Sequence, residues 1–313
     1  MSTYSSQDIP DLSGQVIIVT GGNTGLGYET IRQISQHNPA ARIYLAARNK
    51  EKAEKAILDL EKEKSNTKGT KGTENIRFLQ LDLASFESVK SAAEEFLRLE
   101  SRLDILVNNA GIVMTAEGLT KDGYEIQFGT NVLGPALFTQ LLLPTLRNTV
   151  KVNNQTRMVM LSSTAHTRAP KDVYKFDELR TTASNRHTTQ RYSISKLADL
   201  HYANALAERE IENDVKIIPV HPGLVATNFH HNSTGLFLRP FLYFAVNFFS
   251  IPLEKGALSQ IFAATSPDAK SGQYYGPIGR EDSGSQLAQD HGLQEALFKY
   301  VQGEILGYLE TAA

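Results

Sequence analysis

The sequence of 313 residues contains no cysteine. This absence excludes disulfide bonds, a thiolate nucleophile and thiolate metal ligands, and it fits a reducing compartment. The N-terminal residues 1–15 also lack the basic region and apolar stretch of a secretory signal. We therefore expect a cytoplasmic protein.

The sequence has no large excess of charge of either sign. Its formal net charge is -2, 21% of its residues are charged and 41% are hydrophobic. This balance argues against disorder and against electrostatic attachment to nucleic acid. The eight histidines show no metal-ligand spacing, and His230 and His231 are merely adjacent. We predict neither a nucleic-acid partner nor a bound metal.

Long hydrophobic runs and interdomain linkers are missing as well. The apolar stretch 241–251 has 11 residues, too few to cross a bilayer. The polar residues 62–75 are interpreted as a surface loop between a helix and a strand, not as a domain boundary. We therefore predict a single domain over residues 1–313.

The sequence does contain apolar, β-rich runs that alternate with helical patterns. Nearly continuous apolar strands separated by helices are typical of a parallel sheet covered on both faces. We predict an α/β fold with a Rossmann-type doubly wound parallel sheet and helices on both faces. The six predicted strands are residues 15–20, 42–47, 76–81, 103–108, 157–162 and 215–220.

A glycine-rich segment follows the first predicted strand. Residues 20–27 read TGGNTGLG and precede a helical pattern that begins near Tyr28. Glycines at such a junction let backbone N–H groups approach a phosphate at the helix N-terminus, where the helix dipole favours negative charge. A tight corner would also use glycine, but this position in an α/β chain favours a nucleotide-binding loop.

The end of the second predicted strand bears on the kind of nucleotide. An NAD site usually has an acidic residue there for the ribose 2′-hydroxyl. This sequence has Arg48, with no Asp or Glu between the strand and Glu51. Because a guanidinium suits a 2′-phosphate, we predict NADP(H) as the cofactor. The alternative is that Arg48 is a solvated charge at a strand end.

Tyr192 and Lys196 lie four residues apart in a segment that has the pattern of a half-buried helix. On a helix the pair would share one face and lie opposite an apolar stripe of Ile194, Ala198, His201 and Ala205. Such a pair alone is typical of a surface phenol packed on a lysine stem. Its interpretation therefore depends on the other motifs.

Together the motifs resemble those of the short-chain dehydrogenase/reductase family, over nearly all of the chain up to about Gly279. The pattern TGxxxGxG occurs at residues 20–27, NNAG at 108–111 and YxxxK at 192–196. NTGLG, the AAR strand end, and the later PLEKGA and GQYYGP segments resemble the retinol dehydrogenase-like branch.

The resemblance implies a catalytic tetrad and a set of cofactor contacts. The tetrad would be Asn131, Ser163, Tyr192 and Lys196. From the loop, the strand ends and the HPGLVAT segment, the predicted cofactor-binding residues are Gly21, Asn23, Thr24, Gly25, Leu26, Gly27, Arg48, Asp82, Leu83, Asn109, Ala110, Gly111, Tyr192, Lys196, Pro222, Gly223, Val225 and Thr227.

Each member of the tetrad has an implied role. Tyr192 would exchange a proton with a carbonyl oxygen, and the ammonium of Lys196 would favour its phenolate by opposite charge. The resemblance further implies that Lys196 holds the ribose hydroxyls, Ser163 binds the substrate oxygen and Asn131 anchors a water that links the lysine to solvent. Ser162 also ends a predicted strand, and Ser163 is chosen on the family's register.

The segment 224–255 is expected to cover the substrate, as in the family. Its part 236–253 is rich in aromatic residues, and an apolar cover implies an apolar substrate. Contact with a membrane or with another subunit, or an ordinary core helix, are the alternatives. The 28 residues between Ser163 and Tyr192 suggest an inserted loop at the substrate mouth, or one with a purely structural role.

We therefore expect an NADP(H)-dependent oxidoreductase for a lipophilic ketone, aldehyde or secondary alcohol, of retinoid, steroid, fatty or polyketide type. The NADP(H) preference favours reduction. The alternative is a non-catalytic NADP-binding redox sensor or scaffold, although such proteins usually lose a tetrad member. The resemblance also suggests a homodimer formed through the helices that carry Asn131 and Tyr192.

Overall fold

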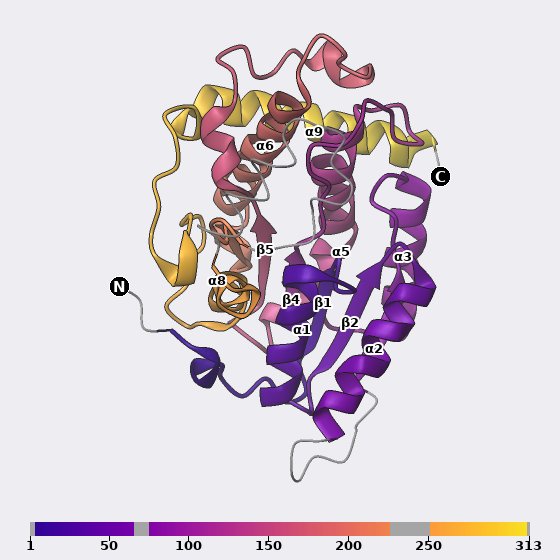
Figure 1. Cartoon of the computed structure of the whole chain (residues 1–313), viewed down its shortest axis with the longest axis vertical. Coiled ribbons are helices and arrows are strands. Elements are labelled where there is room, and N and C mark those ends of the chain that lie inside the picture. The colour runs from indigo at the N-terminus through magenta and orange to yellow at the C-terminus, as the bar shows by residue number, and fades with distance from the viewer. Residues whose placement is uncertain (1–3, 66–74, 226–250, 312–313) are drawn as a thin grey trace.

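The computed structural model describes residues 4–65, 75–225 and 251–311 of the chain. Within them, six parallel strands form one sheet in the order β3-β2-β1-β4-β5-β6 (Figure 1). The strands are β1 (Val16–Thr20), β2 (Arg42–Ala47), β3 (Ile76–Gln80), β4 (Ile105–Asn108), β5 (Arg157–Leu161) and β6 (Lys216–Val220). The predicted doubly wound sheet is confirmed, and its order reverses between β1 and β4, where such folds bind ligands.

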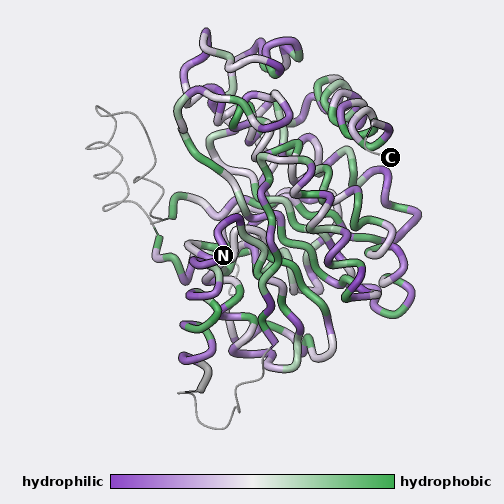
Figure 2. Tube along the Cα trace, turned by 90° about the vertical axis from the view of Figure 1, so that its right-hand side faces the viewer, coloured by the Kyte–Doolittle hydropathy of each residue, from purple (hydrophilic) through white to green (hydrophobic). Residues whose placement is uncertain are grey.

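Alternate residues of β1 enter two different cores, which explains its uninterrupted apolar run. Val16 and Ile18 lie in the core that includes residues of α3, α5 and α6, whereas Ile17 and Val19 lie in the core shared with α1, α2 and α8. Figure 2 shows hydrophobic segments running through the interior of the trace. The helices are α3 (Phe86–Leu99), α5 (Gly134–Val150), α6 (Thr188–Arg209), α1 (Gly25–His37), α2 (Lys50–Ser65) and α8 (Leu253–Thr265).

Several short helices connect these elements. α4 (Ile126–Phe128) and the π-helical turn η2 (Gly129–Leu133) lead into α5. The 3-10 turns are η1 (Ser6–Asp8), η3 (Thr164–Arg168), η4 (Phe176–Arg180), η5 (Ile211–Asn213), η7 (Pro277–Gly279) and η8 (Leu287–Gln289). No helix in the described ranges is both long and apolar enough to span a membrane.

The predicted loop at residues 62–75 is partly wrong. α2 continues to Ser65, so the loop's first residues are helical. Residues 66–74 lie outside the described part of the chain. The pattern KEK at 62–64 is compatible with both states, because glutamate and lysine are good helix formers and are also common on surfaces.

α6 is buried on nearly all sides, which corrects the expectation of a half-buried helix. Of its 22 residues, 16 are buried, including Tyr192 and Lys196. The C-terminal helix α9 (His291–Thr311) packs against α6 (Figure 1). There Phe298 stacks on Tyr202 with ring centroids 5.8 Å apart. The tyrosine–lysine pair is therefore an internal feature.

His201 is buried in α6 as a neutral imidazole with both nitrogens bonded. Nδ1 lies 2.8 Å from the Tyr174 hydroxyl and Nε2 lies 2.9 Å from the Leu287 carbonyl oxygen. Burial lowers the pKa of His201 from 6.5 to about 4. Because the unfolded chain binds this proton more readily, His201 contributes stability that is present above pH 6.5 and is lost as the pH falls through 4.

We expect the free energy of unfolding to fall by on the order of 3 kcal/mol from this group as the pH decreases across that window. Denaturant titrations at several pH values would measure it. His201→Gln removes the titration and should flatten the fall, whereas the same change at the exposed His37 should not. Identical pH profiles for wild type and His201→Gln would contradict this assignment.

Candidate active site

The glycine loop between β1 and α1 needs its glycines for two different reasons. Gly21 and Gly25 have φ angles of +67° and +58°, in the left-handed region that side chains disfavour. Gly27 is required by space, because a Cβ atom there would lie 2.5 Å from the Gly21 carbonyl oxygen. The loop is therefore closely folded against the first turn of α1.

The N-terminus of α1 presents backbone donors at this loop. Thr24 is its N-cap residue, and among the described residues its side chain makes no capping hydrogen bond. The first N–H groups of a helix lack intrahelical acceptors and lie at the positive end of the helix dipole. With the predicted residues Asn23 and Leu26 in the same turn, this end of α1 is suited to a phosphate.

The NNAG segment after β4 is hydrogen-bonded to the end of β1. Thr20 Oγ1 accepts hydrogen bonds from the N–H groups of Asn109 (3.0 Å) and Ala110 (2.9 Å). Asn109 Nδ2 in turn donates to the Thr20 carbonyl oxygen at 2.7 Å. Thr20 thus joins the two loops that flank the point where the strand order reverses.

Arg48 and Asp82 lie just beyond the ends of β2 and β3. Arg48 is exposed, and no ion pair to it occurs among the described residues. Its carbonyl oxygen accepts a hydrogen bond from Gln80 at 2.8 Å, which holds the backbone of this strand end. Asp82 is half-buried and Oδ1 accepts from the Ala84 N–H at 3.1 Å, while Leu83 is buried beside it. The guanidinium of Arg48 is therefore available to an anion.

The loop after β6 packs beside the start of α1. Val225 and Leu26 belong to one apolar cluster with Ala257 and Ile261 of α8. Gly223 has a φ of +80°, which directs the chain between Pro222 and that cluster. The structure thus places Val225 next to Leu26 of the glycine loop, whereas Thr227 and most of segment 224–255 lie outside the described residues.

Tyr192 and Lys196 are buried together on α6, with 8% and 5% of their surfaces exposed. Lys196 Nζ donates to the Leu161 carbonyl oxygen at 2.9 Å and to Asp199 Oδ2 at 2.7 Å. Burial lowers the pKa of Lys196, but the charge of Asp199, the Tyr192 phenol and the hydrogen bond to Asp199 outweigh it and raise the pKa overall. Lys196 is therefore a buried ammonium close enough to Tyr192 to interact with it.

Asn131 connects α6 to the NNAG segment. Its Oδ1 accepts from the Ile112 N–H at 2.8 Å, and its Nδ2 donates to the Ile112 carbonyl oxygen (3.0 Å) and to Ser195 Oγ (3.0 Å). Ser195 Oγ in turn donates a hydrogen bond to the Tyr192 carbonyl oxygen at 2.8 Å. A Cβ on Gly111 would lie 3.2 Å from Asn131 Oδ1 and 3.6 Å from Lys196 Nζ.

The two serines after β5 have different partners. Ser162 is buried, and its hydroxyl donates to the Lys196 carbonyl oxygen at 2.6 Å. Ser163 is only half-buried, and its Oγ accepts from the Ala165 N–H at 3.1 Å at the start of η3. Ser162 therefore fixes α6 against the sheet, and Ser163 remains the predicted substrate contact.

Sequence reasoning missed Asp199 and Ser195, both in contact with members of the predicted tetrad. Asp199 lies one turn after Lys196 and is 1% exposed. Its spacing of i+3 from a lysine is a signal for an ion pair on a helix, but not for a buried one. Ser195 bonds Asn131 across 64 positions of sequence, and no local pattern indicates that contact.

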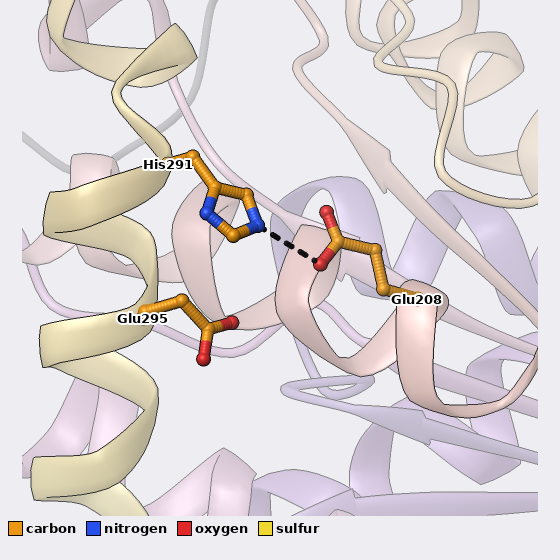
Figure 3. A group of neighbouring side chains, drawn as sticks. All are labelled: Glu208, His291 and Glu295. Atoms are coloured by element: carbon orange, nitrogen blue, oxygen red, sulfur yellow. Dashed lines mark ion pairs between the residues drawn. The ribbon is translucent and has the colours of Figure 1, made fainter.

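A group of possible metal ligands lies elsewhere, where the end of α6 meets α9 (Figure 3). The ligand atoms of Glu208, His291 and Glu295 lie within 4.8 Å of one another. Each carboxylate already has another partner: Glu295 accepts from Arg209 at 2.8 Å and Glu208 accepts from Gln294 at 2.9 Å. We interpret the group as an ion-pair network that attaches α9 to α6.

Comparisons with known proteins show the family to which the chain belongs. A family model described as short chain dehydrogenase matches residues 15–174. An uncharacterized oxidoreductase of Schizosaccharomyces pombe is 37% identical over 303 residues, covering 95% of this chain and 86% of the relative. Retinol dehydrogenase 14 of Homo sapiens is 34% identical over 281 residues, covering 87% of this chain and 80% of the relative.

The chain belongs to the short-chain dehydrogenase/reductase family and is an oxidoreductase of that family. Among solved structures, an uncharacterized protein from Mycobacterium paratuberculosis aligns with a TM-score of 0.72 at 26% identity, over 97% of this chain and 98% of that chain. The NADPH-bound carbonyl reductase from chicken fatty liver shares the fold, with a TM-score of 0.62 at 22% identity over 87% of this chain and 99% of that chain.

Proposed function

We propose that the protein transfers hydride between NADP(H) and a lipophilic ketone, aldehyde or secondary alcohol, with Tyr192 as the general acid and base. The observation that carries the proposal is the burial of the Lys196 ammonium beside Tyr192, next to Gly111 and Asn131. A phenol, an ammonium and an amide close together beside the reversal point of a doubly wound sheet suit carbonyl chemistry.

Three features of this chain fit a dinucleotide. The glycine loop has no room for a Cβ atom at Gly27, the N-terminus of α1 has N–H groups without intrahelical acceptors, and Arg48 has no ion-pair partner among the described residues. Thr24, Gly25 and Leu26 would hold the pyrophosphate, Arg48 the 2′-phosphate and Lys196 the ribose hydroxyls. When bound, the nicotinamide would supply or accept the hydride.

In the direction of reduction, the Tyr192 hydroxyl would give its proton to the carbonyl oxygen as negative charge develops there. The adjacent ammonium stabilises the phenolate that remains. Ser163 would donate a hydrogen bond to the same oxygen, and Asn131 holds the α6 backbone at Tyr192 through Ser195. In the direction of oxidation, the phenolate would take the proton of the alcohol.

Near the first turn of α6 the described surface is hollowed, and most of the residues that line the hollow have polar side chains. An open hollow of about 670 Å³ is lined by Thr115, Ala116, Glu117, Ser184, Arg186, His187, Thr188 and Arg191. Thr188 lies one turn before Tyr192 on α6, and Ser184 and Arg186 come from the inserted residues 164–191, which supports a place for that insertion at the mouth. The lipophilic class is supported by the sequence of residues 236–253 and by the relative named retinol dehydrogenase 14.

An assay of NADPH consumption against retinoid, steroid, fatty-aldehyde and polyketide carbonyls tests the proposal. We expect turnover with at least one of these classes and less with small polar carbonyls. Tight NADPH binding without turnover on any carbonyl would instead favour the non-catalytic sensor or scaffold. Turnover confined to small polar carbonyls would leave the oxidoreductase and overturn the lipophilic class.

Arg48→Ala tests the cofactor. Loss of a charge-assisted contact to the 2′-phosphate should weaken NADPH binding by about 10- to 100-fold and change NADH binding little. Fluorescence titration with both nucleotides measures the two dissociation constants. Arg98→Ala, at another exposed arginine on α3, is the control and should alter neither. Equal losses for NADPH and NADH in Arg48→Ala would count against the contact.

We also propose a cytoplasmic protein that forms a homodimer, with a peripheral membrane contact through residues 236–253 as a further partner. Light scattering would measure the oligomeric state. Co-sedimentation with lipid vesicles, compared with a variant in which Phe241 and Phe244 are replaced by Ser, would test the membrane contact.

A further inference from the structure

A buried carboxylate lies beneath the proposed active-site lysine. Asp199 is 1% exposed, and its Oδ2 accepts a hydrogen bond from Lys196 Nζ at 2.7 Å. Its other oxygen, Oδ1, has no hydrogen-bond partner among the described residues. Lys196 is thus its one charged partner within hydrogen-bond distance in that part of the chain.

The groups around Asp199 are themselves buried. Titratable side chains on three other segments surround this part of α6: Tyr174 from the segment before η4, Tyr274 from the segment before η7, and His166 of η3, which packs edge-on against Tyr274. On α6 itself the titratable neighbours are Tyr192, Lys196 and His201. Burial raises the pKa of both Tyr174 and Tyr274, and the charge of Asp199 raises them further. The charge of Asp199 therefore affects Tyr174 and Tyr274 as well as Lys196.

Stability alone gives no reason for this arrangement. A buried ion pair contributes little to folding, because the cost of desolvating both charges offsets their attraction. A carboxylate with one unsatisfied oxygen is still less favourable. Of the three donors of the Lys196 ammonium, two are taken by Leu161 and Asp199, and the proposed function uses the same ammonium toward Tyr192 and the ribose.

We propose that Asp199 is a positioning residue that orients Lys196 and partly offsets its charge, and so sets the pH at which Tyr192 exchanges its proton. This inference rests on the proposed function, because it acts through the same lysine. Asp199 acts only through Lys196 and contacts neither substrate nor cofactor in this proposal. The exposed carboxylate of Glu212 has no ion pair with this lysine among the described residues.

The sign of the effect follows from charge. Reduction requires the protonated phenol, so its rate falls as the phenolate forms with rising pH. Replacing Asp199 by asparagine leaves the lysine charge uncompensated, and this favours the phenolate. We expect the basic limb of the kcat/KM profile for reduction to move to lower pH by about one unit.

A second effect concerns NADPH binding. Burial raises the pKa of Asp199 from 3.8 to about 6, despite the opposing charge and hydrogen bond of Lys196. Below that pH the wild-type carboxyl is neutral, as the asparagine is at every pH. The ratio of NADPH affinities of Asp199→Asn and wild type should therefore exceed one at neutral pH and approach one below about pH 5. Taking this ratio cancels the titration of the phosphate of NADPH itself.

The experiment compares wild type, Asp199→Asn, Asp199→Glu and the surface control Glu212→Gln. It measures reduction of a lipophilic carbonyl, NADPH dissociation constants by fluorescence, and thermal unfolding, all across pH. We expect only Asp199→Asn to shift the basic limb and to alter the pH dependence of NADPH affinity. A uniform loss of activity at every pH, with an unshifted limb, would show a purely structural residue and overturn the proposal.

If Asp199→Asn does not fold, Asp199→Glu provides the test because it keeps the negative charge. The basic limb of its kcat/KM profile must then lie at the wild-type pH, and a shifted limb would overturn the proposal. If the wild-type protein reduces no carbonyl, the proposed function is wrong. The ratio of the NADPH affinities of Asp199→Asn and wild type then still tests the role of Asp199. A ratio that does not change with pH then overturns the role of Asp199 independently.

Discussion

Tyr192→Phe is expected to lower kcat for carbonyl reduction by about 10³-fold or more and to leave NADPH affinity nearly unchanged. The substitution removes the proton donor but keeps the ring, which is 8% exposed and contributes to the packing of α6. Steady-state kinetics and a fluorescence titration of NADPH on the same protein preparation measure the two quantities.

A matched control is available on the same helix. Tyr202→Phe removes a buried hydroxyl that accepts from Gln140 at 3.1 Å, two to three turns away from Tyr192. It should cost about 1 kcal/mol of stability and leave kcat within a factor of about three. Unchanged turnover in Tyr192→Phe, or an equal loss in both variants, would remove Tyr192 from the proposed chemistry.

Gly27→Ala is expected to weaken NADPH binding by about 100-fold or more. The new methyl group would lie 2.5 Å from the Gly21 carbonyl oxygen and from Asn109 Nδ2, so the backbone of the glycine loop must move. Because the loop presents the N–H groups proposed to bind the pyrophosphate, a shift of this size removes their alignment. Titration with NADPH, together with a denaturant titration, separates lost binding from lost folding.

Gly303→Ala provides the control for this substitution. Gly303 is an exposed residue of α9, and a Cβ there would meet nothing within 4 Å. Alanine should stabilise the helix by about 0.5–1 kcal/mol and leave NADPH affinity unchanged. Wild-type affinity in Gly27→Ala would show that the loop adapts and that its close packing is not needed for the cofactor.

The sheet could be predicted from sequence because its signals are local. Each strand is a short apolar run, and the alternate burial of Val16 and Ile17 in two cores is what such a run indicates. The glycine loop was also predictable, because the left-handed φ angles of Gly21 and Gly25 are conformations that favour glycine over other residues.

The surroundings of α6 could not be predicted in the same way. The periodicity of residues 188–209 suggested an exposed face bearing Tyr192 and Lys196, but the Lys196 ammonium contacts the Leu161 carbonyl oxygen at the end of β5. The contact between Asn131 and Ser195 likewise depends on two helices that meet only in the folded chain. A helical pattern reports the order of polar and apolar residues, not what packs against them.

The sequence by itself determined the chemistry available to this protein: the glycines of the loop, a cation at the end of β2, and a phenol and an ammonium one helical turn apart. Only the tertiary structure decided that Lys196 is buried, that Asp199 offsets its charge, and that Asn131 secures the backbone at Tyr192 through Ser195. The physical reason is that desolvation and charge pairing depend on every segment that surrounds a group, including segments distant in sequence.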